Sequence, residues 1–210
     1  MPDLYKWLSP NRTTTYTCVR WPVRARHWTS PETPELCRSG WHLATLAGLS
    51  KHLPTKFPAV LWTAEGRGAT DSAIDKVAFE SARILAPVGT LTERTAYALA
   101  CDFAEHVLPI WEARYPGDDR PRVAIETKRR WLAGEASDEE RYAAYTAAYT
   151  VAYADTAAYA AAAAARAAAD AAAYAAGAAD AAAYAAYAAD VVDGAEREWQ
   201  GRRILEVLGG

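Results

Sequence analysis

The stretch SDEERYAAYTAAYTVAY, residues 137–153, decides the fold class of the second half of the chain. Ser137 and Glu140 have the spacing of a capping box, in which a hydroxyl and a carboxylate bind the free amides of a first helical turn. Tyrosines follow at steps of three and four residues, which places them on one helical face: Tyr142, Tyr145, Tyr149 and Tyr153. The stretch therefore predicts a helix with one aromatic face.

Alanine, the strongest helix former, dominates the sequence beyond this start. Of the 47 residues at positions 143–189, 31 are Ala, and a ten-residue unit occurs twice in 170–189, as DAAAYAAGAA and DAAAYAAYAA. One unbroken helix from residue 137 to 190 would be about 80 Å long, so we expect breaks near Asp155 and Gly177. The prediction is three antiparallel helices at 138–153, 156–176 and 179–208.

Another helix is predicted just upstream, after a second pair of capping residues. Thr90 and Glu93 have capping-box spacing, and apolar residues then recur at steps of three and four. Pro109 lies inside this pattern, and we expect it to kink the helix or end it early, because proline lacks the amide that the helix needs.

The stretch YPGDDRPR, residues 115–122, predicts the end of that helix and the start of the next. Asp118 and Asp119 are suited to cap a helix, and Pro121 fits its first turn. Gly134 is placed to end it. Residues 90–210 are thus expected to form an all-α, alanine-rich helical bundle.

Residues 1–89 differ, being rich in Trp, Pro and Thr with short apolar runs. Apolar patterning predicts strands at 13–20, 59–64 and 76–85, with a turn at 66–68. Helical spacing predicts a helix at 41–52. The fold class expected is an α+β N-terminal module, residues 1–89, followed by the helical bundle, with helix dominating overall.

The distribution of charge supports two modules. Residues 1–92 carry 11 Lys and Arg against 7 Asp and Glu, whereas residues 93–210 carry 12 against 19. This asymmetry argues against a uniformly basic nucleic-acid-binding protein. Arg20, Arg24 and Arg26, interleaved with Trp21 and Trp28, would suit nucleic-acid contacts, but a solvated edge is the favoured interpretation.

The three cysteines, Cys18, Cys37 and Cys101, show no C-x-x-C spacing and no zinc-binding pattern. The chain has no N-terminal signal segment and no strongly apolar run long enough to span a membrane. We therefore expect a cytoplasmic protein with reduced thiols, no metal site and no cofactor.

Cys37 and His42 are the candidates for catalysis, because a thiol and an imidazole five residues apart could form a nucleophile and base pair. No third group is placed beside them by the sequence, and a buried structural cysteine with a hydrogen-bonded histidine is the favoured interpretation. Asp118, Asp119, Arg120 and Arg122 cluster like a site too. Here a structural role is favoured, with the arginines paired to Glu105 or Glu112.

The segments CDFAEHVLPIWE (101–112), YPGDDRPR (115–122) and AIE (124–126) resemble the "putative immunity protein" family, which has an alanine-rich helical tail. The resemblance covers residues 93–208 and implies an all-helical fold and, through the family's label, toxin neutralisation. LCRSGWHL (36–43), LWTAEG (61–66) and DKVA (75–78) resemble an uncharacterised domain of phages and actinobacteria, which has no established activity.

The leading hypothesis is a non-enzymatic protein, immunity-like or phage-encoded, whose helical domain binds a host protein or a toxin. The tyrosines at 142, 145, 149 and 153 are its candidate contact residues. Two alternatives stay open. One is a small enzyme in residues 1–92 that uses Cys37, His42 or Glu65 in a cleft, and the other is a self-associating, virion-associated structural component.

Overall fold

The computed structural model describes residues 3–14, 19–22, 25–54, 56–154 and 194–209. Contacts within the chain divide it into two compact units. The barrel unit comprises Met1–Thr92 together with Arg197–Gly210, and the helical unit comprises Glu93–Glu196. The predicted fold class, an α+β first half followed by helices, is confirmed for the described residues.

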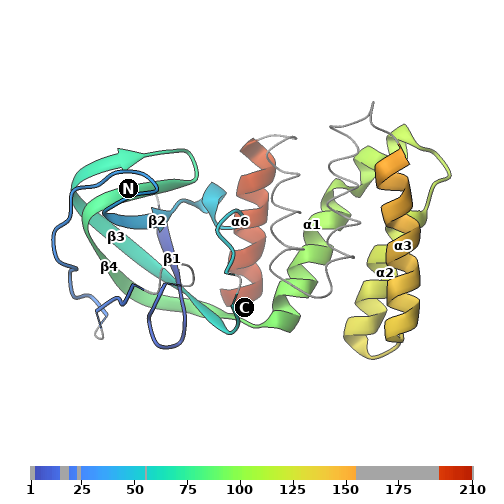
Figure 1. The fold of residues 1–210 in the computed structure, drawn as a ribbon, viewed down its shortest axis with the longest axis horizontal. Coiled ribbons are helices and arrows are strands. Elements are labelled where there is room, and N and C mark those ends of the chain that lie inside the picture. The colour runs from blue at the N-terminus through green and yellow to red at the C-terminus, as the bar shows by residue number, and fades with distance from the viewer. Residues whose placement is uncertain (1–2, 15–18, 23–24, 55, 155–193, 210) are drawn as a thin grey trace. The chain divides into compact units, whose positions relative to one another are not determined.

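The strands of the barrel unit are β1 (Leu4–Leu8), β2 (Trp41–Ala44), β3 (Ala59–Ser72) and β4 (Lys76–Leu91). They pair antiparallel and close on themselves in the order β1-β2-β4-β3 (Figure 1). Apolar side chains fill the interior, because alternate residues of a strand point to the same face. The core cluster consists of Leu4, Leu8, Trp21, Leu43, Trp62, Ala64, Ala82 and Ile84.

Two glycines allow close packing of the last helix within the barrel unit. The short 3₁₀ helix η1 spans Leu46–Gly48, and the helix α6 spans Gly194–Gly209. A Cβ on Gly201 would collide with the carbonyl oxygen of Leu46, and one on Gly89 would collide with that of Leu208. The sequence-based boundary after residue 89, which assigned the whole remainder to the bundle, did not anticipate this packing of 197–210.

Two elements predicted for the barrel unit are wrong. Thr13 and Arg20 form an antiparallel bridge with each other, so the two ends of the strand predicted at 13–20 lie side by side and cannot belong to one continuous strand. Residues 41–52 are not a helix, because Trp41–Ala44 pairs with β4 and only Leu46–Gly48 is helical. The first strand, Leu4–Leu8, was not predicted.

The strands predicted at 59–64 and 76–85 exist but extend further, as a long hairpin. The turn expected at 66–68 is wrong, since β3 continues through it to Ser72. Gly66 lies there because a Cβ would enter the ring of Phe79. Gly68, with φ of +81°, lies where the register between the two strands shifts.

The described helices of the helical unit are α1 (Glu93–Arg114), α2 (Arg120–Ala133) and α3 (Asp138–Ala154). Thr90 does not cap α1, because it belongs to β4 and pairs with Val60. Pro109 does not end α1 early, since the helix continues to Arg114.

The helix ends predicted at Gly134 and Ser137 are confirmed. Gly134 follows α2 with φ of +80°, a left-handed conformation that glycine adopts without strain. Ser137 and Glu140 form both bonds of the capping box before α3, with N–O distances of 2.7 and 3.1 Å. The helix predicted at 156–176, and the first part of the one at 179–208, lie outside the described residues.

Candidate functional site

Of the candidate pair, Cys37 lies in the turn before β2 and His42 is the second residue of that strand. The backbone N–H of Cys37 donates to Nε2 of His42 at 3.0 Å. Since Nε2 is an acceptor, Nδ1 carries the proton and donates to the carbonyl of Gly40 at 3.2 Å. The ring therefore joins two backbone groups, and it is held as one neutral tautomer.

Charge around His42 favours this neutral form. Burial lowers the pKa of His42, and the positive charges of Lys6 and Lys76 lower it further. The hydrogen bond to Gly40 and the charge of Asp71 act in the opposite direction but are outweighed. A neutral ring whose Nε2 is occupied by an amide is poorly suited to take a proton from the thiol.

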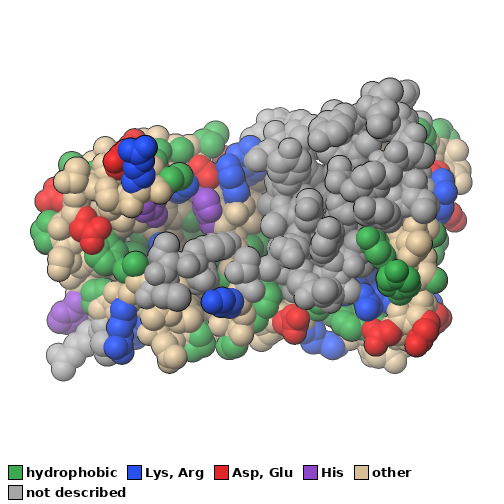
Figure 2. Space-filling model, viewed as in Figure 1, with side chains coloured by type: hydrophobic (Ala, Val, Ile, Leu, Met, Phe, Trp, Pro, Cys, Tyr) green, Lys and Arg blue, Asp and Glu red, His purple; other side chains and the backbone are tan. Residues whose placement is uncertain are grey.

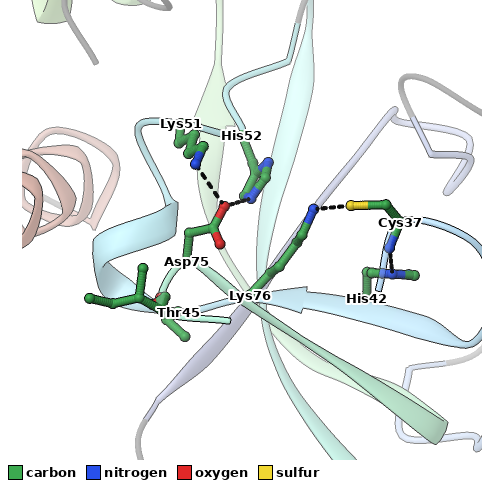
Figure 3. A network of polar contacts seen from close by, with 8 residues as sticks. Cys37, His42, Thr45, Lys51, His52, Asp75 and Lys76 are labelled. Carbon is green, nitrogen blue, oxygen red and sulfur yellow. Dashed lines mark hydrogen bonds and ion pairs between the residues drawn. The ribbon is translucent and has the colours of Figure 1, made fainter. Parts of the chain in front are cut away.

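The thiol of Cys37 has a different neighbour. Nζ of Lys76, the first residue of β4, lies 2.9 Å from its Sγ. Figure 3 shows the Lys76 side chain extending to Cys37, while the side chains of Lys51 and His52 meet at Asp75. The structure thus joins the backbone of Cys37 to the ring of His42 and pairs the thiol with an ammonium group. The expected hydrogen-bonded histidine is present, but the expected burial of Cys37 is wrong, because this residue is exposed at the rim of the turn before β2.

Asp75 anchors the second half of this network. Its Oδ2 lies 3.0 Å from Nε2 of His52 and 3.4 Å from Nζ of Lys51. Burial raises the pKa of Asp75, but the charges of His52 and Lys51 and the hydrogen bonds lower it more, so that it lies below its ordinary value. Lys51 and His52 are thereby tied to a carboxylate.

A pocket with a volume of about 490 Å³ opens between these groups. It is walled by large aromatic side chains and by several charged or titratable groups. The latter are Tyr5, Lys6, Glu32, Cys37, Arg38, His42, His52 and Lys76. Its size lies within the range of about 300–1,000 Å³ that is typical of small-molecule sites.

Lys6 is the unusual member of this set. It lies on the same face of β1 as Leu4 and Leu8, which belong to the barrel core, so its side chain faces inward. Its Nζ donates to the carbonyl of His42 at 2.7 Å and lies 5.3 Å from the ring centre of Trp21. Burial lowers the pKa of Lys6 to about 8.

Sequence reasoning missed the roles of Lys6 and Lys76 in this pocket. The segment LYKWL, residues 4–8, contains a signal for an inward-facing lysine. Leu4, Lys6 and Leu8 are spaced two residues apart, which in a strand places all three on one face. Lys76 gave no such signal, because its partner Cys37 comes from a turn 39 residues earlier.

The charged cluster of the helical unit makes some of the structural contacts expected of it. Arg122 pairs with Glu112 of α1 at 2.6 Å, as predicted, whereas Arg120 pairs with Asp118 at 2.7 Å. Arg120 lowers the pKa of Asp118, chiefly through its side-chain hydrogen bond. Asp119 occupies the N-cap position of α2 but makes no side-chain cap hydrogen bond.

The predicted tyrosine face is described in part. Tyr142 and Tyr145 of α3 lie with ring centres 6.1 Å apart, edge to face, and Tyr142 is 65% exposed. The side chains of Tyr149 and Tyr153 lie outside the described residues. The part that is seen therefore leaves one large aromatic ring facing solvent.

The comparison with protein families assigns the second half of the chain. Residues 87–206 match the family described as "Imm-5 like putative immunity protein", which is more than half of the sequence. The chain belongs to this family. The match confirms the resemblance stated for the helical segments, while residues 1–86, which include the whole pocket lining, are left without an assignment.

The Imm-5 like match runs from the end of β4 through α1, α2 and α3 into α6. No curated protein and no solved structure matches the chain. Among the described residues, none of the helices is long and apolar enough to cross a membrane. Within the same residues, no group of three or more His, Cys, Asp or Glu side chains is arranged to hold a metal ion.

Proposed function

We propose that this Imm-5 like protein neutralises a protein toxin by binding it directly, through the surface of its helical unit. The observation that carries the proposal is the family match over residues 87–206, which contains every described helix of that unit. An immunity protein acts by occupying its toxin, so binding and protection are expected to be lost together.

The surface of the helical unit is suited to a protein partner. Figure 2 shows acidic and basic side chains intermixed on its visible face. Among its described residues, the large apolar side chains most open to solvent are Val123 of α2, 41% exposed, and Tyr142 of α3, 65% exposed. Exposed aromatic and apolar groups within a charged surface are the usual energetic centres of protein interfaces.

Co-expression with candidate protein toxins tests the proposal. The wild-type chain should restore growth and form a complex that survives gel filtration. Val123→Glu and Tyr142→Glu should each weaken the complex at least about tenfold, because a buried unpaired carboxylate is costly in an interface. Absence of both complex and protection would refute the proposal.

Ile74 supplies the matched control, since it is also a large apolar residue, 71% exposed, but lies between β3 and β4 of the barrel unit. Ile74→Glu should leave binding and protection unchanged. If this variant abolished protection while the helical variants did not, the barrel unit would be the toxin-binding part and the assignment to the helices would be wrong.

The other hypotheses drawn from the sequence differ in the support that the structure gives them. A phage origin and a host-protein target stay predictions, as does a self-associating structural role. The enzyme hypothesis gains nothing from the geometry, because the ring of His42 binds backbone groups and the thiol of Cys37 contacts an ammonium group.

A further inference from the structure

The charged lining of the barrel pocket is unbalanced. Three of its members, Lys6, Arg38 and Lys76, are basic, and one, Glu32, is acidic. Arg38 is paired with Glu35, outside the pocket lining, at 2.8 Å. Glu32 accepts a hydrogen bond from the backbone N–H of Gly40 at 3.3 Å.

Within the part of the chain that the structure describes, neither Lys6 nor Lys76 forms an ion pair with a carboxylate. Lys6 donates to a carbonyl and faces the ring of Trp21, and Lys76 contacts the thiol of Cys37. Both ammonium groups are close enough to His42 to lower its pKa. Two positive charges thus act on one small region, and neither is paired with a carboxylate there.

This arrangement has an energetic cost. An ammonium group removed from water is strongly disfavoured unless an opposite charge accompanies it. The lowered pKa of Lys6 is a direct expression of that cost, because burial is its cause. An anion between the two lysines would remove the cost by supplying charge-assisted hydrogen bonds.

The walls of the pocket indicate what the anion is attached to. Trp21 and Trp41 both line it, with ring centres 5.2 Å apart and planes inclined at 83°. Aromatic walls beside a few polar groups are typical of pockets that enclose a small organic molecule, the apolar surfaces binding its body and the polar groups fixing its orientation.

We propose that the barrel pocket binds a small organic anion, whose carboxylate or phosphate lies between Lys6 and Lys76 and whose planar apolar body lies against Trp21 and Trp41. The site is built entirely from residues that precede the Imm-5 like match. Toxin binding by the helical unit and anion binding by the barrel are therefore separate properties, and each can fail without the other.

Calorimetric titration of the full chain with benzoate, indole-3-carboxylate and phenyl phosphate tests the site. At least one of these anions should bind with one-to-one stoichiometry and a Kd below about 1 mM, and it should change the tryptophan fluorescence. The uncharged benzamide and benzyl alcohol should bind at least about tenfold more weakly. No anion binding at tenfold higher concentration, or equal binding of the uncharged compounds, would overturn the proposal.

Variants identify the groups responsible. Lys6→Met and Lys76→Met keep the length of the side chain and remove its charge, and each should weaken anion binding at least about tenfold. Lys51→Met is the matched control, because Lys51 pairs with Asp75 and does not line the pocket; it should bind like the wild type. Wild-type affinity in both pocket variants would refute the site.

Loss of folding must be separated from loss of binding, and circular dichroism of each variant does this. Should Lys6→Met fail to fold, Lys76→Met decides, because Lys76 is the first residue of β4 and lies outside the core cluster. Lys76→Arg, which keeps the positive charge, should retain anion binding; its failure to bind alongside a folded barrel would count against charge as the cause.

Discussion

The ammonium of Lys76 lies 2.9 Å from the Sγ of Cys37, whereas the imidazole of His42 binds the backbone amide of the same cysteine. Five residues of sequence separation suggested a thiol and its base, yet the side chain that reaches the thiol comes from β4. The contact places Cys37 at the rim of a pocket whose other basic group, Lys6, comes from β1.

The described cysteines should differ strongly in reactivity. Cys37 is exposed, whereas Cys101 is 3% exposed and burial raises its pKa to about 11 in spite of the nearby Arg129 and Lys128. Iodoacetamide at pH 7.5 should label Cys37 at least about 100-fold faster than Cys101, because the thiolate is the reacting species and needs access. Peptide mapping by mass spectrometry reads each site, and similar rates would contradict the burial of Cys101.

Anion binding in the barrel pocket should weaken above about pH 8. Lys6 has a pKa of about 8, so its positive charge is present below that pH and is lost above it. Burial lowers the pKa values of His42 and His52, so both rings are neutral in the range tested. The other charged or titratable lining groups are Tyr5, Glu32, Cys37, Arg38 and Lys76. Titrations between pH 6.5 and 9.5 measure the effect.

Lys6→Arg is the control for this pH dependence, because a guanidinium group stays charged up to pH 12 and beyond. This variant should bind anions with an affinity that is flat across pH 8. A fall of the same size in the variant would show that another group causes the titration.

The packing of α6 on the barrel unit gives a third prediction. Gly201 leaves no room for a Cβ beside the carbonyl of Leu46, whereas nothing lies within 4 Å of the position that a Cβ on Gly209 would occupy. Gly201→Ala should therefore destabilise the barrel unit by about 1–3 kcal/mol, the usual cost of overpacking. Gly209→Ala should be neutral or slightly stabilising, because alanine favours helix in either position. Urea unfolding monitored by tryptophan fluorescence compares the two.

The sequence predicted the helical unit well because its signals are local. The capping box at Ser137 and the left-handed Gly134 each depend on residues within one turn, and both are present. Thr90 shows the limit of such signals. Its spacing to Glu93 is correct for a cap, but pairing with Val60 recruits it into β4 instead.

The barrel was predicted poorly because its contacts are remote in the sequence. Residues 41–44 carry an apolar spacing that also suits a helix, and only their pairing with residues 76–79 makes them a strand. Short apolar runs are ambiguous in this way, and tertiary pairing overrides local preference. The pocket lining comes from β1, β2 and β4 and from the connecting segments that carry Trp21, Cys37 and His52, so no single stretch of sequence could reveal it.

The capping box before α3 provides a quantitative test of the local signals. Ser137 accepts from the amide of Glu140 through its hydroxyl, and Glu140 accepts from the amide of Ser137 through its carboxylate. Ser137→Ala should cost about 1 kcal/mol of helical-unit stability. In a double-mutant cycle, the losses of unfolding free energy in Ser137→Ala and Glu140→Ala should sum to more than the loss in the double variant. The reason is that the two hydrogen bonds join the same pair of residues and depend on each other. Strict additivity would show that the box is not formed in solution.

Lys128 of α2 gives the final prediction, and it concerns stability against pH. The side chain is fully buried in the helical unit, its Nζ has no hydrogen-bond partner among the described residues, and it lies 3.6 Å from the ring centre of Tyr97 and 4.1 Å from that of Trp131. Burial, followed by the charge of Arg141, lowers the pKa of Lys128 to about 8, outweighing the opposing influence of the nearby acidic groups.

In the unfolded chain Lys128 keeps its proton up to about pH 10. Between pH 8 and 10 the unfolded state therefore binds more protons than the folded state, so the contribution of Lys128 to stability rises with pH. Below pH 8 both states are protonated, and the penalty for burying the charge is fully present. The free energy of unfolding of the wild type should accordingly rise relative to that of Lys128→Met, by at most about 1.4 kcal/mol per pH unit in this window.

Urea unfolding of both proteins at pH 7, 8, 9 and 9.5 measures this difference. Lys6, whose pKa is also lowered, is common to both chains and cancels. Arg130→Met, which removes an exposed charge two residues further along the same helix, should run parallel to the wild type at every pH. A difference between wild type and Lys128→Met that stays constant from pH 7 to 9.5 would mean that Lys128 titrates as it does in water. The ammonium would then have to be solvated, and the buried position between Tyr97 and Trp131 would be wrong.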